Sequence, residues 1–488
     1  MGSCPLEKSE SKMIDRREIL DTASRMSLTP HVVEKDYVLG WMLAGISAHP
    51  ALRDSWLFKG GTCLKKCFFE TYRFSEDLDF TLTEPSHLDE EFLSSTFSAV
   101  GEWIYERTGI EVPAHLQNFD IYTNPRGSIS CQGKVSYRGP VASRDLPRIK
   151  LDLTADERIV LAPVRVSVFH PYSDAPVEGI DILAYAYEEL FGEKVRALAE
   201  RTRPRDLYDV VNLFRNAEAR PHAAVMLDVL RQKCEFKGIS VPALTDLEPH
   251  RGELQNLWKN MLAHQLPTLP PYESFWDELP AFFEWLADGV TPDIPAAFTI
   301  GAGETVLRQR NLRLPVSAQA QTIIEIIRFA AGNRLLVELD YQGSTRRIEP
   351  YSLRSTRDGN IVLHAWNTDR NEHRSYRVDR MQGARVTNAV FTPRYAVELS
   401  PQGPVQVAQS TARPETLTTR ATFDNPRSTS RNASRRSTSS GKPVHIYQCP
   451  VCNKKFRRDR LNGRLNPHKN DWGGPCPGRT GFFVETRY

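Results

Sequence analysis

The most constraining feature of this 488-residue chain is a short acidic stretch that alternates apolar and polar residues. Residues 73–80 read RFSEDLDF, in which Leu78 separates Asp77 from Asp79. Side chains two positions apart lie on the same face of a strand, so the pattern predicts a strand whose carboxylates share one face. Because like charges this close repel each other, we expect divalent cations to neutralise them.

A glycine pair precedes this stretch. The apolar residues 56–58 predict a strand that runs into Gly60 and Gly61, and a helix follows. Glycines let the backbone approach a phosphate, and the first N–H groups of the helix are available as donors, to which Thr62 adds a hydroxyl. Residues 148–155, RIKLDLTA, predict a neighbouring strand that contributes a third carboxylate, Asp152. Two Mg²⁺ ions held in this way stabilise the attacking and leaving oxygens of an in-line displacement.

The remaining patterns predict several separate units. Residues 29–50 predict a helix with Thr29 as its N-cap and Pro30 at its first position, and most of 181–290 has helical periodicity with a break at Pro204. Residues from 317 on predict a helix followed by β-hairpins. Residues rich in Ser, Thr, Arg and Pro then predict a disordered linker. The expected domains are a core with N-terminal helices (1–180), a helical domain (181–295), a small β-rich domain (317–399), the linker (400–442) and a cysteine module (443–488).

The charge of the chain is unevenly distributed. The net charge is +3, but residues 401–488 hold 16 Lys and Arg against 5 Asp and Glu, so about +11 lies on the tail and about −8 on the rest. A basic tail of this kind favours binding to a polyanion such as nucleic acid, or it is simply solvated and has no partner. No apolar run approaches the ~20 residues that span a bilayer, and the N-terminus lacks the apolar core of a signal peptide. We therefore expect a cytoplasmic protein with no membrane partner.

The cysteines predict a metal site near the C-terminus. Five of the eight cysteines are scattered, and three lie close to the end of the chain. Cys449 and Cys452 form a Cys-x2-Cys pair, and His468 and Cys476 complete four ligands for a structural zinc ion, with His445 as a competitor to His468. The module has too few apolar residues to fold without metal. Unliganded cysteines in a flexible tail are the alternative.

The order of the motifs resembles that of the polymerase-β-like nucleotidyltransferases, and more closely the AbiEii/AbiGii family. The segments that carry this resemblance are EKDYVLGWML, FKGGTCLKK, RFSEDLDF and EKVRALAERTRPRDLYD, and the resemblance covers residues 15–290. Members of that family are bacterial nucleotidyltransferase toxins of type IV toxin–antitoxin and phage-abortive systems. The resemblance implies an α+β multidomain fold and transfer of a nucleotide from an NTP, with the tRNA 3′ end as acceptor in some members.

The resemblance also implies site residues. Gly60, Gly61 and Thr62 would hold the triphosphate, and Asp77 and Asp79 would hold two Mg²⁺ ions. Asp152, added from its strand position, would activate the acceptor hydroxyl. Five further residues match the basic and RDLYD motifs of the family: Lys66, Lys194, Arg205, Asp206 and Asp209. Alternatively, Lys194 is a solvated residue on a helix surface, and the RDLYD residues form a helix cap and an ion pair.

Residues 317–399 resemble a WYL domain through RRIEPYSL, IVLHAWN and RSYRVDRM. The Trp-Tyr-Leu that names the domain is replaced by Ile361, Val362 and Leu363. The resemblance implies binding of nucleic acid or a nucleotide ligand, and control of the attached activity. Three arginines are spaced by three residues: Arg374, Arg377 and Arg380. They would contact phosphate groups of the ligand, or else they keep an edge strand soluble.

Together these features predict an Mg²⁺-dependent nucleotidyltransferase that acts on RNA, favouring tRNA, as a toxin in bacterial defence. The basic segment that follows the Cys-x2-Cys pair suits contact with a nucleic-acid backbone. Two other classes stay open: a nucleic-acid-binding regulator with a silent transferase fold, and a transferase that modifies protein hydroxyls. The sequence also leaves open which NTP is used, whether an antitoxin protein is a partner, and the oligomeric state.

Overall fold

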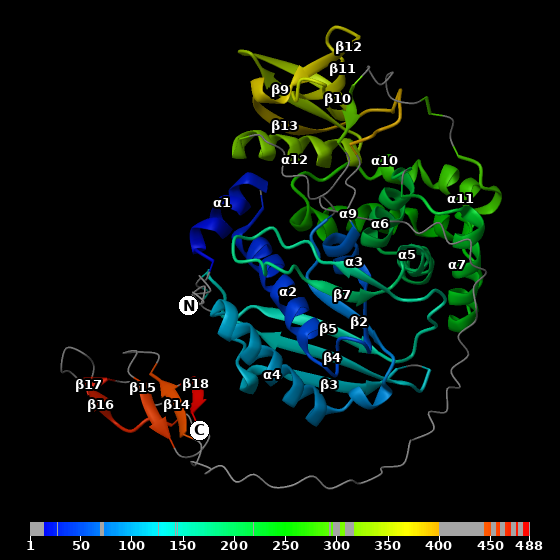
Figure 1. Cartoon of the computed structure of the whole chain (residues 1–488). Helices are drawn as coiled ribbons and strands as arrows, with labels where there is room; N and C mark the ends of the chain where they lie inside the picture. Colours follow the sequence, from blue (N-terminus) through cyan, green and yellow to red (C-terminus); the bar gives the residue numbers. More distant parts are fainter. Residues whose placement is uncertain are drawn as a thin grey trace, which may run out of the picture. The chain divides into compact units, whose positions relative to one another are not determined.

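The computed structural model describes most of the chain, in two compact units, Met1–Thr418 and Thr419–Tyr488. Within these units, the described residues are 14–26, 28–68, 73–124, 126–141, 143, 145–217, 219–291, 294–295, 303–307, 317–399, 444–449, 455–458, 464–469, 475–476 and 482–487. The larger unit contains a mixed α+β fold with two sheets (Figure 1). The α+β fold class predicted from the sequence is therefore confirmed.

A seven-stranded mixed sheet forms the centre of the N-terminal half, in the order β3-β4-β5-β2-β1-β7-β6. Its strands are β1 (Trp56–Lys59), β2 (Asp77–Leu82), β3 (Asn118–Thr123), β4 (Ile129–Ser136), β5 (Arg148–Thr154), β6 (Val164–Ser167) and β7 (Asp181–Ala184). Strand β2 runs antiparallel to β1 and parallel to β5. The two acidic strands predicted from the sequence are therefore direct neighbours in this sheet.

Helices α1 (Arg16–Met26), α2 (Pro30–Ala48) and α4 (Glu90–Thr108) accompany the sheet, and α2 packs on both α1 and α4 (Figure 1). Helix α2 begins as the sequence predicts, with Pro30 at its first position after Thr29. Most of its residues are buried, because it lies between α1, α4 and β7. Helix α3 (Gly60–Cys63) continues into a π-helical turn over Leu64–Phe68, which brings the glycine pair to the end of β1.

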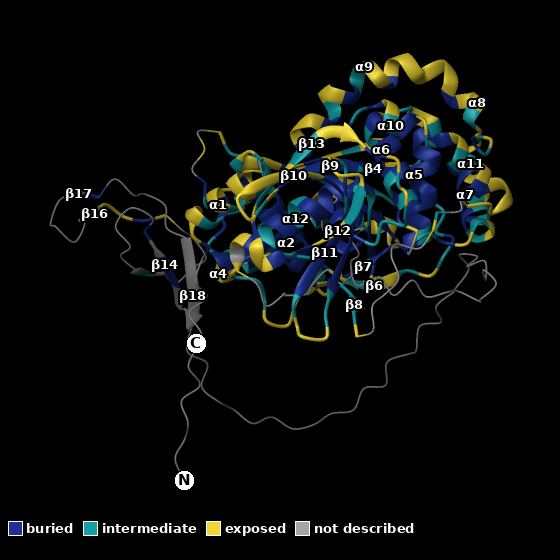
Figure 2. Ribbon diagram, turned by 90° about the horizontal axis from the view of Figure 1, so that it is seen from above, coloured by how far each residue is buried: buried dark blue, intermediate teal, exposed yellow. Residues whose placement is uncertain are grey.

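A helical region follows the sheet. It consists of α5 (Tyr187–Arg201), α6 (Pro204–Arg215), α7 (Ala223–Lys237), α8 (Leu244–Leu247), α9 (Arg251–Leu262), α10 (Glu273–Trp276) and α11 (Leu279–Asp288). The predicted break at Pro204 is present. Figure 2 shows that α5 and α6 are largely buried, whereas α8 and α9 expose many residues.

The prediction that helical structure begins at residue 181 is wrong. Residues Asp181–Ala184 form β7, which pairs in parallel with β1, and the first helix begins only at Tyr187. Ile182 and Ala184 are buried while Asp181 is exposed, so these four residues alternate as a strand does. The sheet therefore extends past the boundary at residue 180 that the sequence suggested.

The second sheet belongs to residues 305–390. Helix α12 (Ala318–Gly332) precedes β9 (Leu335–Tyr341), β10 (Ser344–Ser355), β11 (Ile361–Asn367), β12 (Glu372–Arg377) and β13 (Met381–Val390), and β8 (Thr305–Val306) pairs with β10. The hairpins β9–β10 and β11–β12 are those that the sequence predicts. Tyr208 on α6 donates a hydrogen bond of 2.9 Å to Asn333 after α12, which ties this domain to the helical region.

The smaller unit contains short strands. β14 (Val444–Gln448) pairs with β15 (Lys455–Arg458) and β18 (Phe482–Arg487), and β16 (His468–Lys469) pairs with β17 (Pro475–Cys476). The predicted linker 400–442 lies outside the described residues. Across the described part of the chain, we find no helix with the length and apolar character that a membrane span requires.

Candidate active site

A tight turn after β1 brings backbone against the acidic strand. Gly60 has φ +79°, in the left-handed region that favours glycine. A Cβ at this position would lie 1.9 Å from Asp79 Oδ2. Both the backbone conformation and the close approach therefore require glycine at residue 60, and the turn lies directly beside the carboxylate.

Three carboxylates share one face of the sheet at this turn. Asp79 on β2 is the register partner of Asp152 on β5, and also of Lys59 on β1. Asp77 lies two residues before Asp79 and so projects to the same face. The structure therefore brings together the three acids that the sequence predicts, from two adjacent strands.

Burial and neighbouring acids destabilise the ionised forms of Asp79 and Asp152. Burial and the neighbouring Asp152 raise the pKa of Asp79 to about 6, although Lys59 and Lys194 act in the opposite direction. Burial, followed by repulsion from Asp77, also raises the pKa of Asp152. Among the described residues, no hydrogen bond or ion pair reaches the side-chain oxygens of these three acids. Such a set of oxygen donors fits a hard divalent cation, which would relieve the repulsion.

A second charge group lies beside the acids, in which the side chains of Lys194, Asp206 and Asp209 are buried. Lys194 Nζ on α5 is 2.7 Å from Asp209 Oδ2 and 3.6 Å from Asp206 Oδ1, both on α6. Asp206 also accepts two hydrogen bonds, of 2.8 and 2.9 Å, from Arg201. The three predicted residues Lys194, Asp206 and Asp209 are therefore in one network, in which the two helices on either side of Pro204 are joined by charge pairs.

Sequence reasoning missed Arg73, the first residue of the acidic stretch. Its guanidinium makes a bidentate pair with Asp209, with N–O distances of 2.8 and 2.9 Å, and also donates to Gln265. Arg73 and Lys194, in that order, hold the pKa of Asp209 far below its usual range despite burial. The pair links the segment that leads into β2 with α6, so it fixes the acidic strand relative to the helical region.

A further buried group surrounds Lys59, which sequence reasoning also missed. Its ammonium lies 3.5 Å from Glu157 and 3.6 Å from Glu193. Glu193 also pairs with Lys233 at 3.3 Å, and these cations hold the pKa of Glu193 at about 2. Lys59 meets these glutamates from separate elements, so the sequence offered no local signal for this group.

The structure places three other predicted residues away from direct contact with the acids. The Thr62 hydroxyl is buried and donates to the backbone carbonyl of Asp77, so it supports β2. Lys66 is 1% exposed and donates to Asp36 on α2 at 2.7 Å. Arg205 is half-buried, with Nε 3.4 Å from the Met261 carbonyl, and burial followed by the nearby Arg73 lowers its pKa.

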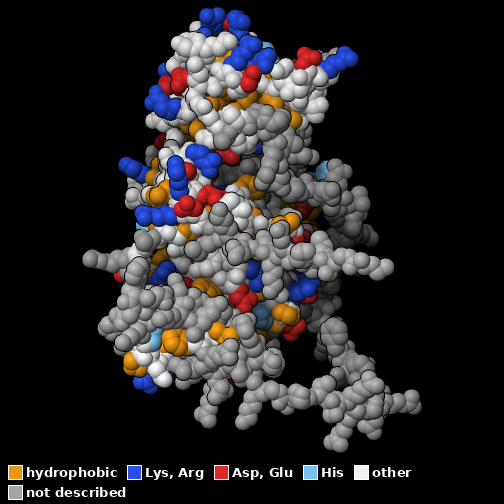
Figure 3. Space-filling model, turned by 60° about the vertical axis from the view of Figure 1, so that its left-hand side comes forward, with side chains coloured by type: hydrophobic (Ala, Val, Ile, Leu, Met, Phe, Trp, Pro, Cys, Tyr) orange, Lys and Arg blue, Asp and Glu red, His pale blue; other side chains and the backbone are white. Residues whose placement is uncertain are grey.

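The arginine series of β12 does not converge. Arg374 and Arg377 are three residues apart on a regular strand, so they project from opposite faces. Each makes a local pair, Arg374 with Glu372 at 2.6 Å and Arg377 with Asp379 at 2.8 Å, while Arg380 is exposed in the turn that follows. Figure 3 nevertheless shows Lys and Arg side chains gathered over the end of the larger unit formed by the second sheet.

The smaller unit brings three of the four predicted zinc ligands together. One ligand atom from each of Cys449, His468 and Cys476 lies within 4.8 Å of the others, and the two sulfurs are 3.7 Å apart. His468 and Cys476 are register partners in β16 and β17. Nδ1 of His468 is 2.9 Å from the Asn466 carbonyl, which would leave Nε2 as the ligand. Cys452 lies outside the described residues.

A glycine turn beside carboxylates on two neighbouring strands, with Lys194 of α5 close to them, suits the binding of a nucleotide and a divalent cation. The sequence profile of the nucleotidyl transferase AbiEii toxin of type IV toxin–antitoxin systems matches residues 41–288, just over half of the chain. The chain belongs to this family of nucleotidyltransferase toxins. A WYL domain profile matches residues 322–386, which confirms the second resemblance.

Two solved structures are similar to parts of this chain at low identity. MenT4, a nucleotidyltransferase toxin from Mycobacterium tuberculosis H37Rv, is 16% identical over 57% of this chain and 91% of its own, with a TM-score of 0.36. Proteasome accessory factor B/C of Arthrobacter aurescens is 17% identical over 38% of this chain and 32% of its own, with a TM-score of 0.14. No curated protein sequence matches the chain significantly.

Proposed function

We propose that the protein is an Mg²⁺-dependent toxin that transfers a nucleotide from an NTP to RNA, with tRNA as the favoured acceptor. The observation that carries this proposal is the alignment of Asp77, Asp79 and Asp152 on one face of β2 and β5 beside the Gly60 turn. Family membership supplies the reaction class. The acceptor and the metal are the parts that the experiment below tests.

In this proposal the chain positions the NTP with backbone and carboxylates. The N–H groups of the turn at Gly60, Gly61 and Thr62 bind the triphosphate. Asp77 and Asp79 hold two Mg²⁺ ions, which supply charge neutralisation at the phosphates. Arg205, whose electrostatic neighbours include Asp77, contacts the phosphates from the helical side.

The acceptor hydroxyl then attacks the α-phosphorus of the NTP. The new bond joins the hydroxyl oxygen to this phosphorus, the bond to the bridging oxygen of the β-phosphate breaks, and pyrophosphate leaves with the electron pair. Asp152 accepts the hydroxyl proton, a role that its raised pKa favours because a stronger base removes a proton more readily. Lys194 and Asp209 hold α5 and α6 against this site through their 2.7 Å pair.

The other two modules are proposed to recognise nucleic acid or a ligand. Arg374, Arg377 and Arg380 offer separate phosphate contacts over the surface of the WYL domain rather than one convergent site. Cys449, His468 and Cys476, with Cys452, hold a structural zinc ion. An antitoxin protein is the expected partner of the toxin family, and substrates of this kind are those of the bacterial cytoplasm.

The test incubates the full chain with Mg²⁺, total bacterial RNA and each α-labelled NTP in turn. We expect label in RNA from wild type, and none from Asp77→Ala or Asp79→Ala. Asp120→Ala is the matched control, because Asp120 is an exposed acid on β3 of the same sheet. Label in protein instead of RNA would identify a protein-modifying transferase. No label, with equal nucleic-acid binding by all variants, would favour a regulator with a silent transferase fold.

A further inference from the structure

The face of the large sheet that carries the candidate catalytic acids continues as an exposed surface over β5 and β4. Residues on β5 alternate between exposed and buried, and Arg148, Lys150 and Asp152 are the exposed ones. The other face of the sheet is apolar and packs on a helix, since Phe97 of α4 contacts Phe119 of β3 with ring centroids 5.3 Å apart. The acid-bearing face is therefore accessible to a large substrate beside Asp152.

Strand register leads from Asp77 to a series of basic residues. Asp77 on β2 is the register partner of Lys150 on β5, and Lys150 is in turn the partner of Lys134 on β4. Neighbouring strands lie about 5 Å apart, so the two lysines follow the acid at successive steps of this size. Arg148, two residues before Lys150, faces the same side of the sheet. We call these three cations the basic surface: Lys134, Arg148 and Lys150.

Neither lysine of the basic surface has an ion-pair partner in the described part of the chain. Lys134 and Lys150 are both exposed, and like charges directly opposite each other on neighbouring strands destabilise a sheet. Asp120, an exposed acid of β3, lies in the next row across the strands, with Asp79 and Asp152. A bound anion relieves the repulsion between the lysines, and successive cations suit a chain that carries a charge on every unit.

The order of the strands separates this surface from the position proposed for the NTP. Strand β2 lies between β1, which ends at the Gly60 turn, and β5, which carries Asp152. A triphosphate bound at the Gly60 turn would therefore lie on the β1 side of the acids. The basic surface lies on the opposite side, beyond Asp152, from which an acceptor hydroxyl can approach for an in-line displacement.

We propose that the basic surface binds the phosphate backbone of the acceptor RNA next to its terminal hydroxyl. Lys150 contacts the phosphate nearest to the attacking hydroxyl, and Lys134 and Arg148 contact phosphates farther along the RNA. This assignment rests on the proposed transferase function and adds the side of the sheet from which the acceptor enters. Contacts to phosphates position an RNA without reading its bases, so the surface fixes where the RNA end lies and not which sequence it has.

Photo-crosslinking tests this surface without relying on nucleotide transfer. A single-stranded RNA with 4-thiouridine beside its 3′-terminal nucleotide is irradiated with the full chain, and the crosslinked peptides are mapped by mass spectrometry. Mapping is needed because the basic residues 401–488 can bind RNA elsewhere. The Asp77→Ala/Asp79→Ala double variant is irradiated in parallel. Crosslinks in both proteins locate the RNA whether or not transfer occurs, which separates this result from the fate of the proposed transferase activity.

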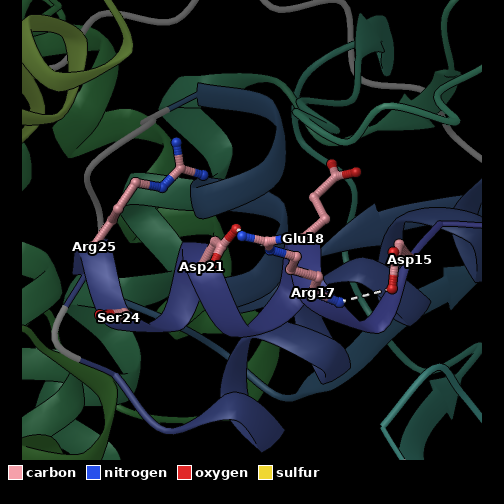
Figure 4. A pocket seen from close by; sticks show the side chains of 6 residues that line it. All are labelled: Asp15, Arg17, Glu18, Asp21, Ser24 and Arg25. Carbon is pink, nitrogen blue, oxygen red and sulfur yellow. Dashed lines mark hydrogen bonds and ion pairs between the residues drawn. The ribbon is translucent and has the colours of Figure 1, made fainter.

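Lys134→Gln and Arg148→Gln each remove one charge from the basic surface, and Lys134→Arg keeps the charge. Lys150 is left unchanged because its charge also acts on Asp152. The matched controls are Lys259→Gln on α9 and Arg17→Gln on α1, where Figure 4 shows Arg17. The four substituted residues are all exposed, so each variant should fold, and thermal unfolding checks this.

We expect wild type to crosslink within β4 and β5. Lys134→Gln and Arg148→Gln should each weaken RNA binding there about three- to tenfold, measured as crosslink yield against RNA concentration, and reduce the slope of log K against log salt by about 0.7. Lys134→Arg and the two controls should match wild type.

Crosslinks confined to the WYL domain or to residues 401–488 would overturn the proposal, as would equal yields in Lys134→Gln and Lys259→Gln. Transfer of label to protein, with no RNA crosslink in β4 or β5, would assign the surface to a protein acceptor and also overturn it.

Discussion

Gly60 and Asp79 approach each other so closely that no side chain fits between them. A Cβ on residue 60 would lie 1.9 Å from Asp79 Oδ2, and the φ of +79° at Gly60 disfavours any other residue. The turn that would bind phosphate and the carboxylate that would bind metal are thus held in contact. Their relative position depends on the absence of a Cβ atom at residue 60.

Gly60→Ala should therefore disable the site. We expect nucleotide transfer to fall about 100-fold or more, since a shift of about 1 Å at reacting groups has effects of this size. Gly238→Ala is the control, because Gly238 also has a positive φ of +70° but has nothing within 4 Å of the added Cβ. It should cost about 1 kcal/mol of stability and leave the transfer rate unchanged. Equal rates for the two variants would contradict this account.

Asp79→Asn should stabilise the protein when metal is absent. The raised pKa of Asp79, about 6, means that the folded state keeps a proton that the unfolded state releases near pH 4. Above about pH 6 the folded carboxylate is ionised and repelled, so the amide should add about 1–2 kcal/mol. We expect a higher unfolding temperature in EDTA at pH 7.5 and no gain at pH 4. A gain that persists at pH 4 would point to another cause.

Arg73→Met should destabilise the chain through Asp209. The substitution keeps the approximate length of the side chain but, among the residues that the structure describes, leaves the buried Asp209 carboxylate paired with Lys194 alone, at 2.7 Å. Breaking a buried pair on one side costs about 3–5 kcal/mol, which urea unfolding would measure. Arg73→Met/Asp209→Asn should recover part of this loss, because the neutral amide needs no cationic partner and its oxygen can still accept a hydrogen bond from Lys194. A double variant no more stable than Arg73→Met would exclude this pairing as the cause.

Zinc should be bound by the smaller unit alone. We expect one zinc ion per chain by elemental analysis, lost in Cys449→Ser and in Cys476→Ser. Since these ligands all belong to the smaller compact unit, the unfolding temperature of the larger unit should stay the same when zinc is chelated. Cys234→Ser is the control, because Cys234 is a buried free cysteine of α7. Full zinc content in Cys476→Ser would contradict the proposed ligand set.

The sequence predicted the elements whose signals are local. The alternation around Asp77 and Asp79 gave β2, the residues around Asp152 gave β5, and Pro30 marked the start of α2. Residues 181–184 were assigned to helix because four residues carry little periodicity and a helical pattern follows directly. These residues form a strand because they pair with β1, which is distant in the sequence.

Long-range charge pairs were beyond sequence reasoning. Arg73 binds Asp209 across 136 positions, and Lys59 reaches Glu157 and Glu193 from separate elements. Spacing along the chain carries no signal for such contacts. By contrast, Lys194 and Asp209 were predicted as site residues because the family motifs include them, although the motifs did not predict that the two residues contact each other.

The most direct measurement of the central claim follows the two ends of the NTP separately. Wild type and Asp79→Asn are incubated with Mg²⁺, RNA and NTP labelled at either the α- or the γ-phosphate. If Asp77, Asp79 and Asp152 serve nucleotidyl transfer, α-label enters RNA, γ-label leaves as pyrophosphate, and Asp79→Asn loses about 10³-fold in rate. Entry of γ-label into RNA, or transfer by Asp79→Asn at the wild-type rate, would contradict the account.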